Sequence, residues 1–373
     1  MKCAVVGLGI GLAHVAGYLA HPKAQLVAVA DAWAPRRAKV GGTFSQGSMR
    51  LLEPLFEPPQ MAAGTVEKRW EELGVRVYRE ASEVAADGEI ELVSLCTPDD
   101  SHEALGIELL EAGKHLLLEK PLALTLEGSQ RLIDAARAND RRVSVGYEFR
   151  VNPAVRRLRE LVASGRLGES RAFSLYHYRT PFRRDKWQNW IQSRERSGGL
   201  IIEETCHWFD LARYMRNCAV ESVHCVGTGD IHPDFDYEDL AYIQGRYSDG
   251  GVFQISHALT GYDFSLVLQV HGTEGTAWCG LKEERHSSLD AGAGDYLGVV
   301  SYGPVNGSPA DATVETYGAE ATEPFNIKEC TKATVEAMME GGPFPADLED
   351  GLESLRIALA ARRSLESGVV ESV

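Results

Sequence analysis

A short stretch in the second half of the chain combines carboxylates with a histidine. Glu203-Glu204-Thr205-Cys206-His207 is predicted to be helical, and helical spacing places both glutamates beside His207, at i, i+4 and at i, i+3. A carboxylate next to an imidazole fixes the tautomer of the ring, which can then carry a proton or bind a hydroxyl group. We therefore regard His207 as a catalytic candidate supported by Glu203 or Glu204. The alternative is a buried histidine of a domain interface.

A second candidate for proton transfer is Lys120, which ends the predicted strand HLLLEK. If a positively charged group lies beside this strand end, desolvation and like charge favour the neutral amine, which can accept a hydroxyl proton. The alternative is an exposed lysine at the end of a strand. A metal ion at Glu204-x-x-His207 would need a second ligand set of comparable spacing. No such set is visible, so we predict no metal site.

The elements that would position Lys120 belong to a predicted parallel sheet. Up to about residue 146, short apolar runs alternate with helical segments, a pattern typical of strands joined by crossover helices. Their uninterrupted apolar character suits strands that are covered on both faces. We predict an α/β Rossmann domain with a doubly wound parallel sheet over residues 1–146, interrupted by an unassigned insertion at about 43–66.

Residues 147–373 follow a different pattern and predict an α+β domain with an antiparallel sheet. A helix is expected at about 200–214, followed by strands of alternating character with hairpin signals at 248–251 and 272–275. Residues 282–320 are rich in glycine, serine and acidic residues and stay unassigned. Like the insertion, they could cover a cleft or contact another subunit.

The first predicted strand leads into a glycine-rich turn, Gly7-Leu8-Gly9-Ile10-Gly11, that opens a helix. In a dinucleotide-binding turn, the first glycine allows the tight bend and the second lets backbone approach a pyrophosphate at the helix N-terminus. Leu12 stands where a third glycine is expected, and Gly11 could relieve the same crowding. The alternative is a tight strand-to-helix turn that binds nothing.

The cofactor preference follows from Asp31, which ends the second predicted strand about 20 positions after Gly9, as expected for a ribose-binding carboxylate. A carboxylate there accepts the ribose hydroxyls and repels a 2'-phosphate, so we predict NAD rather than NADP. Arg36 and Arg37 could meet a 2'-phosphate or stack on adenine, or simply begin a solvated helix.

Composition limits the class of protein. The 373 residues are 44% hydrophobic and 25% charged, which is ordinary for a globular protein, and the length suggests two domains. A net charge of -16 argues against nucleic acid and anionic membranes as partners. The seven scattered cysteines form no C-x-x-C pair and suit a reducing compartment. We expect a cytoplasmic protein.

The run Gly113-Lys114-His115-Leu116-Leu117-Leu118-Glu119-Lys120-Pro121 resembles the glucose-fructose oxidoreductase, inositol dehydrogenase and MocA (Gfo/Idh/MocA) family. Further segments match in the same order: the glycine turn with His14, Thr97-Pro98 with His102, 165–168, Gly198-Gly199, and His207 with Asp210. The resemblance implies a large, mostly antiparallel open sheet in the second domain, which often forms subunit contacts, and thus a homodimer or homotetramer. It also implies Lys120 between nicotinamide and substrate, and a Lys120-Pro121 peptide bond that could be cis.

The resemblance completes a set of expected cofactor-binding residues: Gly7, Gly9, Ile10, Gly11, Asp31, Arg36, Thr97, Pro98, His102, Glu119, Lys120 and Trp190. The family usually has aspartate four residues before the histidine, so Glu203 matches by position. We expect the substrate to be bound by Tyr147, Arg150, Arg179, Arg183, Lys186 and His207. Cations mixed with aromatic residues at 179–190 could hold an anionic or sugar substrate, or instead cover the cofactor or contact a subunit.

The main functional hypothesis is hydride transfer between NAD and a ring hydroxyl of a sugar, glycoside or cyclitol, with Lys120 and His207 handling the proton. One alternative is an NAD-dependent glycoside hydrolase that works through transient oxidation of the sugar at C3, followed by elimination. Its substrate could be an anionic sugar such as a uronate or sulfonate. A second alternative is a sensor that binds NAD(H) without catalysis.

Overall fold

The structure is a computed structural model that describes residues 1–38, 70, 73–179, 187–261, 265–282, 298–318 and 326–373. Two compact units account for these residues. The first comprises 1–147, 185–190 and 327–352, and the second comprises 148–184, 191–326 and 353–373. The unassigned insertion at 43–66 lies outside the described residues, as do 283–297 and 319–320 of the other unassigned segment.

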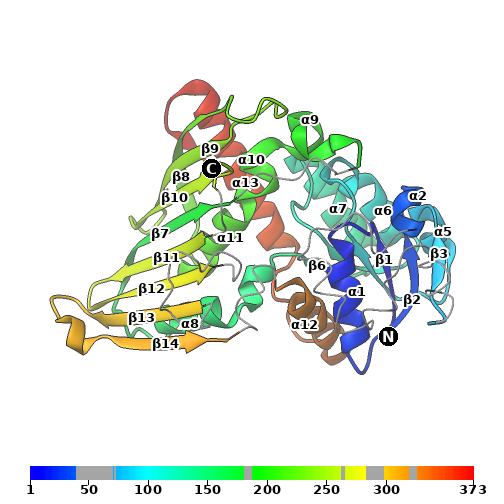
Figure 1. The fold of residues 1–373 in the computed structure, drawn as a ribbon, viewed down its shortest axis with the longest axis horizontal. Coiled ribbons are helices and arrows are strands. Elements are labelled where there is room, and N and C mark those ends of the chain that lie inside the picture. Colours follow the sequence, from blue (N-terminus) through cyan, green and yellow to red (C-terminus); the bar gives the residue numbers. More distant parts are fainter. Residues whose placement is uncertain (39–69, 71–72, 180–186, 262–264, 283–297, 319–325) are drawn as a thin grey trace. The chain divides into compact units, whose positions relative to one another are not determined.

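The first unit contains a six-stranded sheet in the order β3-β2-β1-β4-β5-β6, in which every neighbouring pair is parallel (Figure 1). The strands are β1 (Lys2–Val6), β2 (Gln25–Ala30), β3 (Arg76–Tyr78), β4 (Leu92–Leu95), β5 (His115–Leu118) and β6 (Val143–Val145). Strand order reverses between β1 and β4, where ligands of doubly wound sheets bind. This confirms the predicted Rossmann architecture.

The helices of this unit cross between the parallel strands. They are α1 (Gly11–Ala20), α2 (Ala34–Ala38), α5 (Ala81–Ala86), α6 (His102–Glu111) and α7 (Leu126–Ala138). Buried apolar residues of β1, β2, β4 and α1 form one core, to which Trp70 and Val335 also belong. The core thus includes a residue more than 180 positions after the last strand of the sheet.

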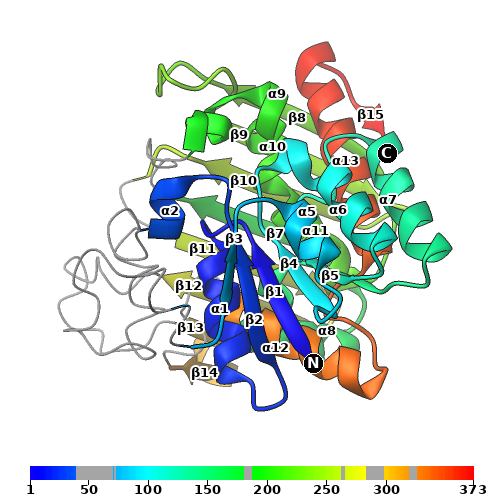
Figure 2. The same ribbon diagram turned by 90° about the vertical axis from the view of Figure 1, so that its right-hand side faces the viewer.

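That late residue belongs to α12 (Ile327–Glu340), which packs against α1 (Figure 2). Sequence analysis placed this segment in the second domain, whereas here it is part of the first unit. The physical reason is a close approach of the two helices at Gly17, where an added Cβ atom would lie 2.6 Å from Thr331 Cβ and 3.0 Å from Lys328 O. Only a residue without a side chain fits this contact.

The second unit contains a nine-stranded sheet in the order β14-β13-β12-β11-β7-β10-β9-β8-β15. All neighbours are antiparallel except β7 and β10, which are parallel. The sheet is therefore mostly antiparallel and open, as predicted. Its strands are β7 (Ser170–Tyr178), β8 (Val220–Thr228), β9 (Leu240–Tyr247), β10 (Val252–Ala258), β11 (Ser265–Gly272), β12 (Gly275–Lys282), β13 (Gly298–Pro304), β14 (Thr313–Tyr317) and β15 (Glu371–Ser372).

Helices cover one face of this sheet. They include α8 (Pro153–Ala163), which packs on β12 and β13, and α11 (Thr205–Arg216), which packs on β7 and β10. The short helices α9 (Arg194–Ser197) and α10 (Gly199–Glu203) precede α11, and α13 (Leu348–Ser367) follows α12. Within the described ranges, no helix is long and apolar enough to cross a membrane.

The contact between α1 and α12 can be tested at Gly17. Replacing Gly17 with leucine should destabilise the protein by about 1–3 kcal/mol, because the side chain overpacks the helix contact. Gly88→Ala is the matched control, since a Cβ atom at Gly88 would meet nothing within 4 Å. Urea unfolding measures both variants, and equal stability of the two would contradict the packing of α12 on α1.

Candidate active site

The glycine-rich turn after β1 has no room for side chains. Gly7 has a φ of +90°, and a Cβ atom there would collide with the carbonyl oxygen of Cys96. Gly11 lies so close to β1 that a Cβ atom would be 2.7 Å from Val5 Cγ1. Gly11 thus serves the close packing of helix on strand that the third glycine of the fingerprint provides elsewhere. Leu12, in the expected position of that glycine, is a core residue instead.

Asp31 holds the turn from the end of β2. Its carboxylate accepts hydrogen bonds from the backbone N–H groups of Leu8 (2.7 Å) and Trp33 (2.8 Å). Arg36 lies 3.9 Å from the same carboxylate and 5.3 Å from the Trp33 ring. A Cβ atom at Gly9 would lie 2.7 Å from Arg36 Nη1, so this guanidinium extends over the turn.

These residues fit NAD. The backbone of Gly7 and Gly9 could approach a pyrophosphate at the start of α1, and Arg36 adds a positive charge above it. Asp31 keeps acceptor capacity beyond its two backbone hydrogen bonds, as ribose hydroxyls require. Ile10, at the N-cap of α1, is exposed beside the turn.

Glu119, at the end of β5, is the centre of a buried polar network. Its Oε1 atom lies 2.9 Å from His14 Nε2, and His14 Nδ1 lies 3.1 Å from Ser94 Oγ. The network continues through the hydroxyl of Tyr18 to Ser94 (2.7 Å) and through Thr331 to His14 (3.3 Å). Helices α1 and α12 and strand β4 therefore all help to fix one carboxylate.

The charge of Glu119 is stabilised in spite of its burial. Burial raises the pKa of the Glu119 carboxyl, but the hydrogen bond from His14 and the electrostatic attraction of His14 and the adjacent Lys120 outweigh it and lower this pKa. Lys120, the next residue, is partly buried, and its peptide bond with Pro121 is cis, as the resemblance implied. An ionised carboxylate thus lies beside the candidate catalytic lysine.

His102 joins the two loops that follow β4 and β5. It is fully buried, and its ring nitrogens lie 3.0 Å from the carbonyl oxygen of Thr97 and 2.8 Å from that of Pro121. Burial lowers the pKa of this imidazole. Predicted as a cofactor residue, His102 is placed by these contacts to hold the loops together. Ser101 Oγ adds a hydrogen bond to Thr97 Oγ1 (2.7 Å).

Three of the predicted groups share one edge of the parallel sheet. The glycine turn follows β1, Thr97 and Pro98 follow β4, and Lys120 follows β5. Because β1, β4 and β5 are adjacent and parallel, their carboxyl ends meet at the same edge, at the point where strand order reverses. Tyr147, which is buried, and Trp190 also belong to this unit.

The second unit carries His207 in the first turn of α11. An acidic group that sequence analysis did not consider lies near its ring: Glu148 Oε2 is 3.7 Å from His207 Nδ1. Phe149 packs edge-on against the imidazole, with ring centroids 5.4 Å apart. A carboxylate 59 positions earlier in the chain leaves no spacing signal, and only the fold reveals the pair.

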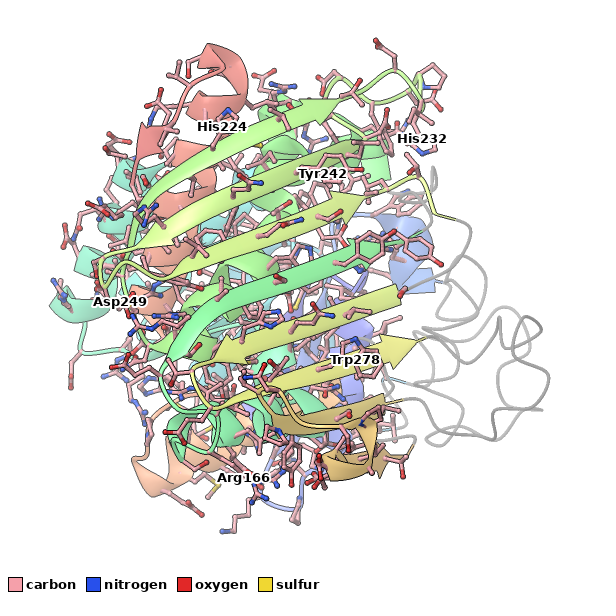
Figure 3. All side chains as sticks on the ribbon, turned by 90° about the vertical axis from the view of Figure 1, so that its left-hand side faces the viewer. Arg166, His224, His232, Tyr242, Asp249 and Trp278 are labelled. Atoms are coloured by element: carbon pink, nitrogen blue, oxygen red, sulfur yellow. The ribbon has the colours of Figure 1, made fainter. Side chains whose placement is uncertain are left out.

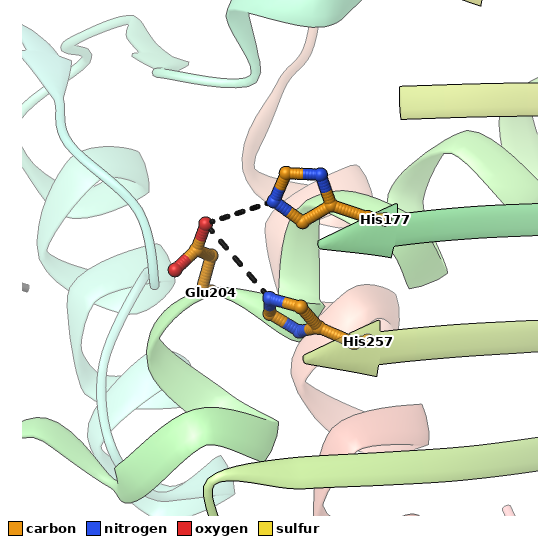
Figure 4. Close-up of side chains that lie close together, drawn as sticks. All are labelled: His177, Glu204 and His257. Carbon is orange, nitrogen blue, oxygen red and sulfur yellow. Dashed lines mark ion pairs between the residues drawn. The ribbon is translucent and has the colours of Figure 1, made fainter. Parts of the chain in front are cut away.

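Glu204 is directed towards the sheet. Its Oε1 atom is 3.0 Å from Arg179 Nη1, 3.5 Å from His177 Nε2 and 3.9 Å from His257 Nε2 (Figure 4). Burial raises the pKa of the Glu204 carboxyl, but the charge of Arg179 outweighs it and holds this pKa well below its usual range. Arg179, a predicted substrate residue, therefore forms an ion pair inside the protein.

Arg150, also predicted to bind substrate, forms a buried bidentate ion pair. Its Nε and Nη2 atoms donate to the two carboxylate oxygens of Asp210, at 2.8 and 2.7 Å. The partner of Asp210 thus comes from 60 positions away in the chain. Arg183 and Lys186 lie outside the described residues.

The ion pair suggests a structural role for Arg150. Arg150→Met should cost about 3–5 kcal/mol in unfolding free energy, because Asp210 would stay buried without its counter-charge. The double variant Arg150→Met/Asp210→Leu should recover most of this loss. Urea unfolding of both variants provides the measurement. If Arg150 instead binds a ligand, the single variant will be nearly as stable as the unmodified protein, and ligand affinity will fall in both.

Comparisons with known proteins follow the same division of the chain. A family model described as "Oxidoreductase family, NAD-binding Rossmann fold" matches residues 1–147, and one described as "GFO/IDH/MocA C-terminal domain" matches 155–278. The 1,5-anhydro-D-fructose reductase of Ensifer adhaerens is 29% identical over 77% of this chain and 80% of its own. The scyllo-inositol 2-dehydrogenase (NAD(+)) of Bacillus subtilis is 25% identical over 99% of this chain and 95% of its own.

Solved structures share the fold over the whole chain. Levoglucosan dehydrogenase in complex with NADH and L-sorbose has a TM-score of 0.76 at 20% identity and covers 100% of this chain, with 98% of its own chain matched. GenD2 from gentamicin A biosynthesis, in complex with NAD, has a TM-score of 0.77 at 21% identity and covers 100% of this chain, with 96% of its own chain matched. The first model covers the glycine turn and the parallel sheet described above, and the second covers part of the open sheet. The chain belongs to the Gfo/Idh/MocA family of NAD-binding oxidoreductases.

Proposed function

We propose that this oxidoreductase transfers hydride between NAD and a ring hydroxyl group of a sugar or cyclitol. The main support is the shared edge of the parallel sheet, where Lys120 follows β5 beside the turn that fits the cofactor. Relatives named for activity on inositols and on 1,5-anhydro-D-fructose support the substrate class.

Lys120 is proposed to carry the proton. Bound NAD supplies a nicotinamide ring that exchanges hydride with a substrate carbon. In the oxidation direction, the neutral amine of Lys120 accepts the hydroxyl proton at Nζ, and in the reduction direction its ammonium group returns one. The neighbouring carboxylate of Glu119, fixed by His14, keeps the lysine in place and compensates its charge once it is protonated.

His207 belongs to the second unit, and its role in proton transfer is proposed separately from that of Lys120. Its imidazole, with Glu148 Oε2 3.7 Å from Nδ1, can bind or deprotonate a hydroxyl group through Nε2. Glu148 then replaces Glu204 as a proposed support beside Glu203, because Glu204 is directed towards Arg179. A carboxylate in this place favours the protonated ring during turnover.

Lys120→Met should lower kcat/KM by about 10²–10⁴-fold, the usual contribution of a general acid or base, and change NADH affinity far less. Lys23→Met, at an exposed lysine of the same unit, is the control. Steady-state NADH formation is measured with myo-inositol, scyllo-inositol, levoglucosan and related sugars, and cofactor binding by NADH fluorescence. Full turnover in Lys120→Met would refute the role of Lys120, and inactivity of the unmodified enzyme on every such polyol would refute the substrate class.

The open face of the nine-stranded sheet supports a homo-oligomer (Figure 3). Strand register aligns side chains into rows across the sheet. One row is Val226, Tyr242, Ser256, Tyr176, Val267, Gly280 and Val299. The next is His224, Gln244, Gln254, Ser174, Gln269, Trp278 and Ser301.

Neither row contains Asp, Glu, Lys or Arg, although the chain has a net charge of -16. Tyr176, Tyr242 and Val226 are each 49% exposed on this face. A face depleted of charge and rich in aromatic residues is typical of a subunit interface. We propose that a second copy of this chain covers it, in a homodimer or homotetramer.

The double variant Tyr176→Lys/Tyr242→Lys should dissociate the oligomer, because it places lysines where copies of the face would meet. Ile231→Lys, at an apolar residue that is 52% exposed outside these rows, should leave assembly unchanged. Sedimentation velocity gives the mass of each variant. A monomeric unmodified protein, or a lysine variant that stays assembled, would contradict the proposal.

A further inference from the structure

Three buried side chains meet in the second unit at a place that the proposed function does not use. They are His177 on β7, His257 on β10, and Glu204 between α10 and α11 (Figure 4). Both histidines are fully buried, and the glutamate is 4% exposed. One ligand atom from each lies within 4.8 Å of the other two. Sequence analysis set aside a metal ion for want of a second ligand set, and the fold supplies that set from two strands.

The parallel pairing of β7 and β10 creates this juxtaposition. In the register of the two strands, His177 lies directly opposite His257. Both side chains point to the face that α11 covers, where Glu204 begins the helix. The imidazoles of two neighbouring strands and the Glu204 carboxylate at the start of α11 approach a common point from three directions.

The distances suit a shared metal ion. Donor atoms that each lie 2.0–2.1 Å from a tetrahedral zinc ion are about 3.4 Å apart. The observed separations from Glu204 Oε1 are 3.5 Å to His177 Nε2 and 3.9 Å to His257 Nε2. The two separations from Glu204 would need to shorten by only a few tenths of an ångström, and the two histidine nitrogens, which lie within 4.8 Å of each other, would move closer around the ion.

The hydrogen bonds of the two rings set the tautomers that a metal ion requires. His177 Nδ1 lies 3.0 Å from the carbonyl oxygen of Ser265, which can only accept, so Nδ1 carries the hydrogen. Thr205 Oγ1 donates to Leu200 O at 2.8 Å and therefore accepts from His257 Nδ1, also at 2.8 Å. In each neutral ring, the lone pair is on Nε2, directed towards the carboxylate. Metal-binding histidines are typically oriented by such contacts.

We propose that His177, Glu204 and His257 bind a divalent transition metal ion such as Zn²⁺. Two imidazoles and one carboxylate form a nitrogen and oxygen ligand set that suits zinc and its neighbours in the first transition series. The ion would join β7 and β10 to the start of α11. His207 lies in the first turn of that helix, and Trp208 contacts the rings of His207, His177 and His257.

Arg179 competes for the same carboxylate. Its guanidinium is 3.0 Å from Glu204 Oε1, and its side chain is 21% exposed at the end of the site. Glu204 Oε2 accepts no hydrogen bond from any residue that the structure describes, so this oxygen is available as a ligand. Removing the arginine should therefore strengthen metal binding.

The test uses the full-length protein, loaded with Zn²⁺ and dialysed against zinc-free buffer. One zinc per chain is expected, and X-ray absorption should show only nitrogen and oxygen ligands at about 2.0–2.1 Å. Sulfur at about 2.3 Å would assign the zinc to the cysteines instead and overturn the proposal, as would a chain that retains no zinc.

Variants separate the three ligands from other sites. Glu204→Gln and His257→Gln should each lower zinc affinity by roughly 100-fold or more, since even residues that only orient ligands contribute 10–100-fold. Arg179→Met should raise it by about tenfold, through loss of a like charge. The control His271→Gln removes an exposed histidine of β11 and should change nothing. Folded ligand variants that bind zinc normally would refute the site, and if they do not fold, the absorption spectrum of the unmodified protein decides.

Discussion

Burial of negative charge is the constraint on which much of this structure depends. An ionised carboxylate inside a protein costs several kcal/mol unless a cation or several hydrogen bonds compensate it. Glu119 has His14, Asp210 has Arg150, and Glu204 has Arg179. Each compensated carboxylate fixes a corner where strands and helices meet. The polar residues close to the proposed chemistry are held in place by these pairs rather than by the apolar core alone.

The pairs differ in what they do for function. In the first unit, the carboxylate of Glu119 is fixed by residues of α1, β4 and α12, so the neighbouring Lys120 is attached to a rigid support. In the second unit, the ion pair of Arg150 with Asp210 anchors the segment that carries Glu148, the acidic neighbour of His207. Both proposed catalytic groups therefore lie one residue or one turn away from a buried ion pair.

Local patterns predicted the first unit well because its strands are short apolar runs, and its glycine turn and Asp31 follow β1 and β2 directly. The role of Gly11 in close helix packing was also visible in the sequence. Other contacts were not, because they join residues far apart in the chain. The packing of α12 on α1 is one example, and the approach of Glu148 to His207 is another.

The histidines of the proposed metal site show the same limit. His177 stands in its strand between exposed or partly exposed neighbours and His257 between buried Ser256 and partly exposed Ala258, and only the strand register brings the two histidines face to face. Parallel pairing of β7 with β10 could not be expected from hairpin signals, which predict antiparallel neighbours. Sequence patterns describe each strand, whereas the order of strands in the sheet depends on the packing of the whole unit.

The position of β7 has a consequence for how the chain folds. This strand is the first of its sheet in the sequence and yet lies in the middle of it, between β10 and β11. Its partners are synthesised about 80 to 100 residues later, so the sheet closes through contacts of long sequence separation, which form slowly. The first unit also waits for α12, which follows the entire second sheet except β15. The two units are interleaved along the chain, and neither can be completed on the ribosome before nearly all of the protein has been made.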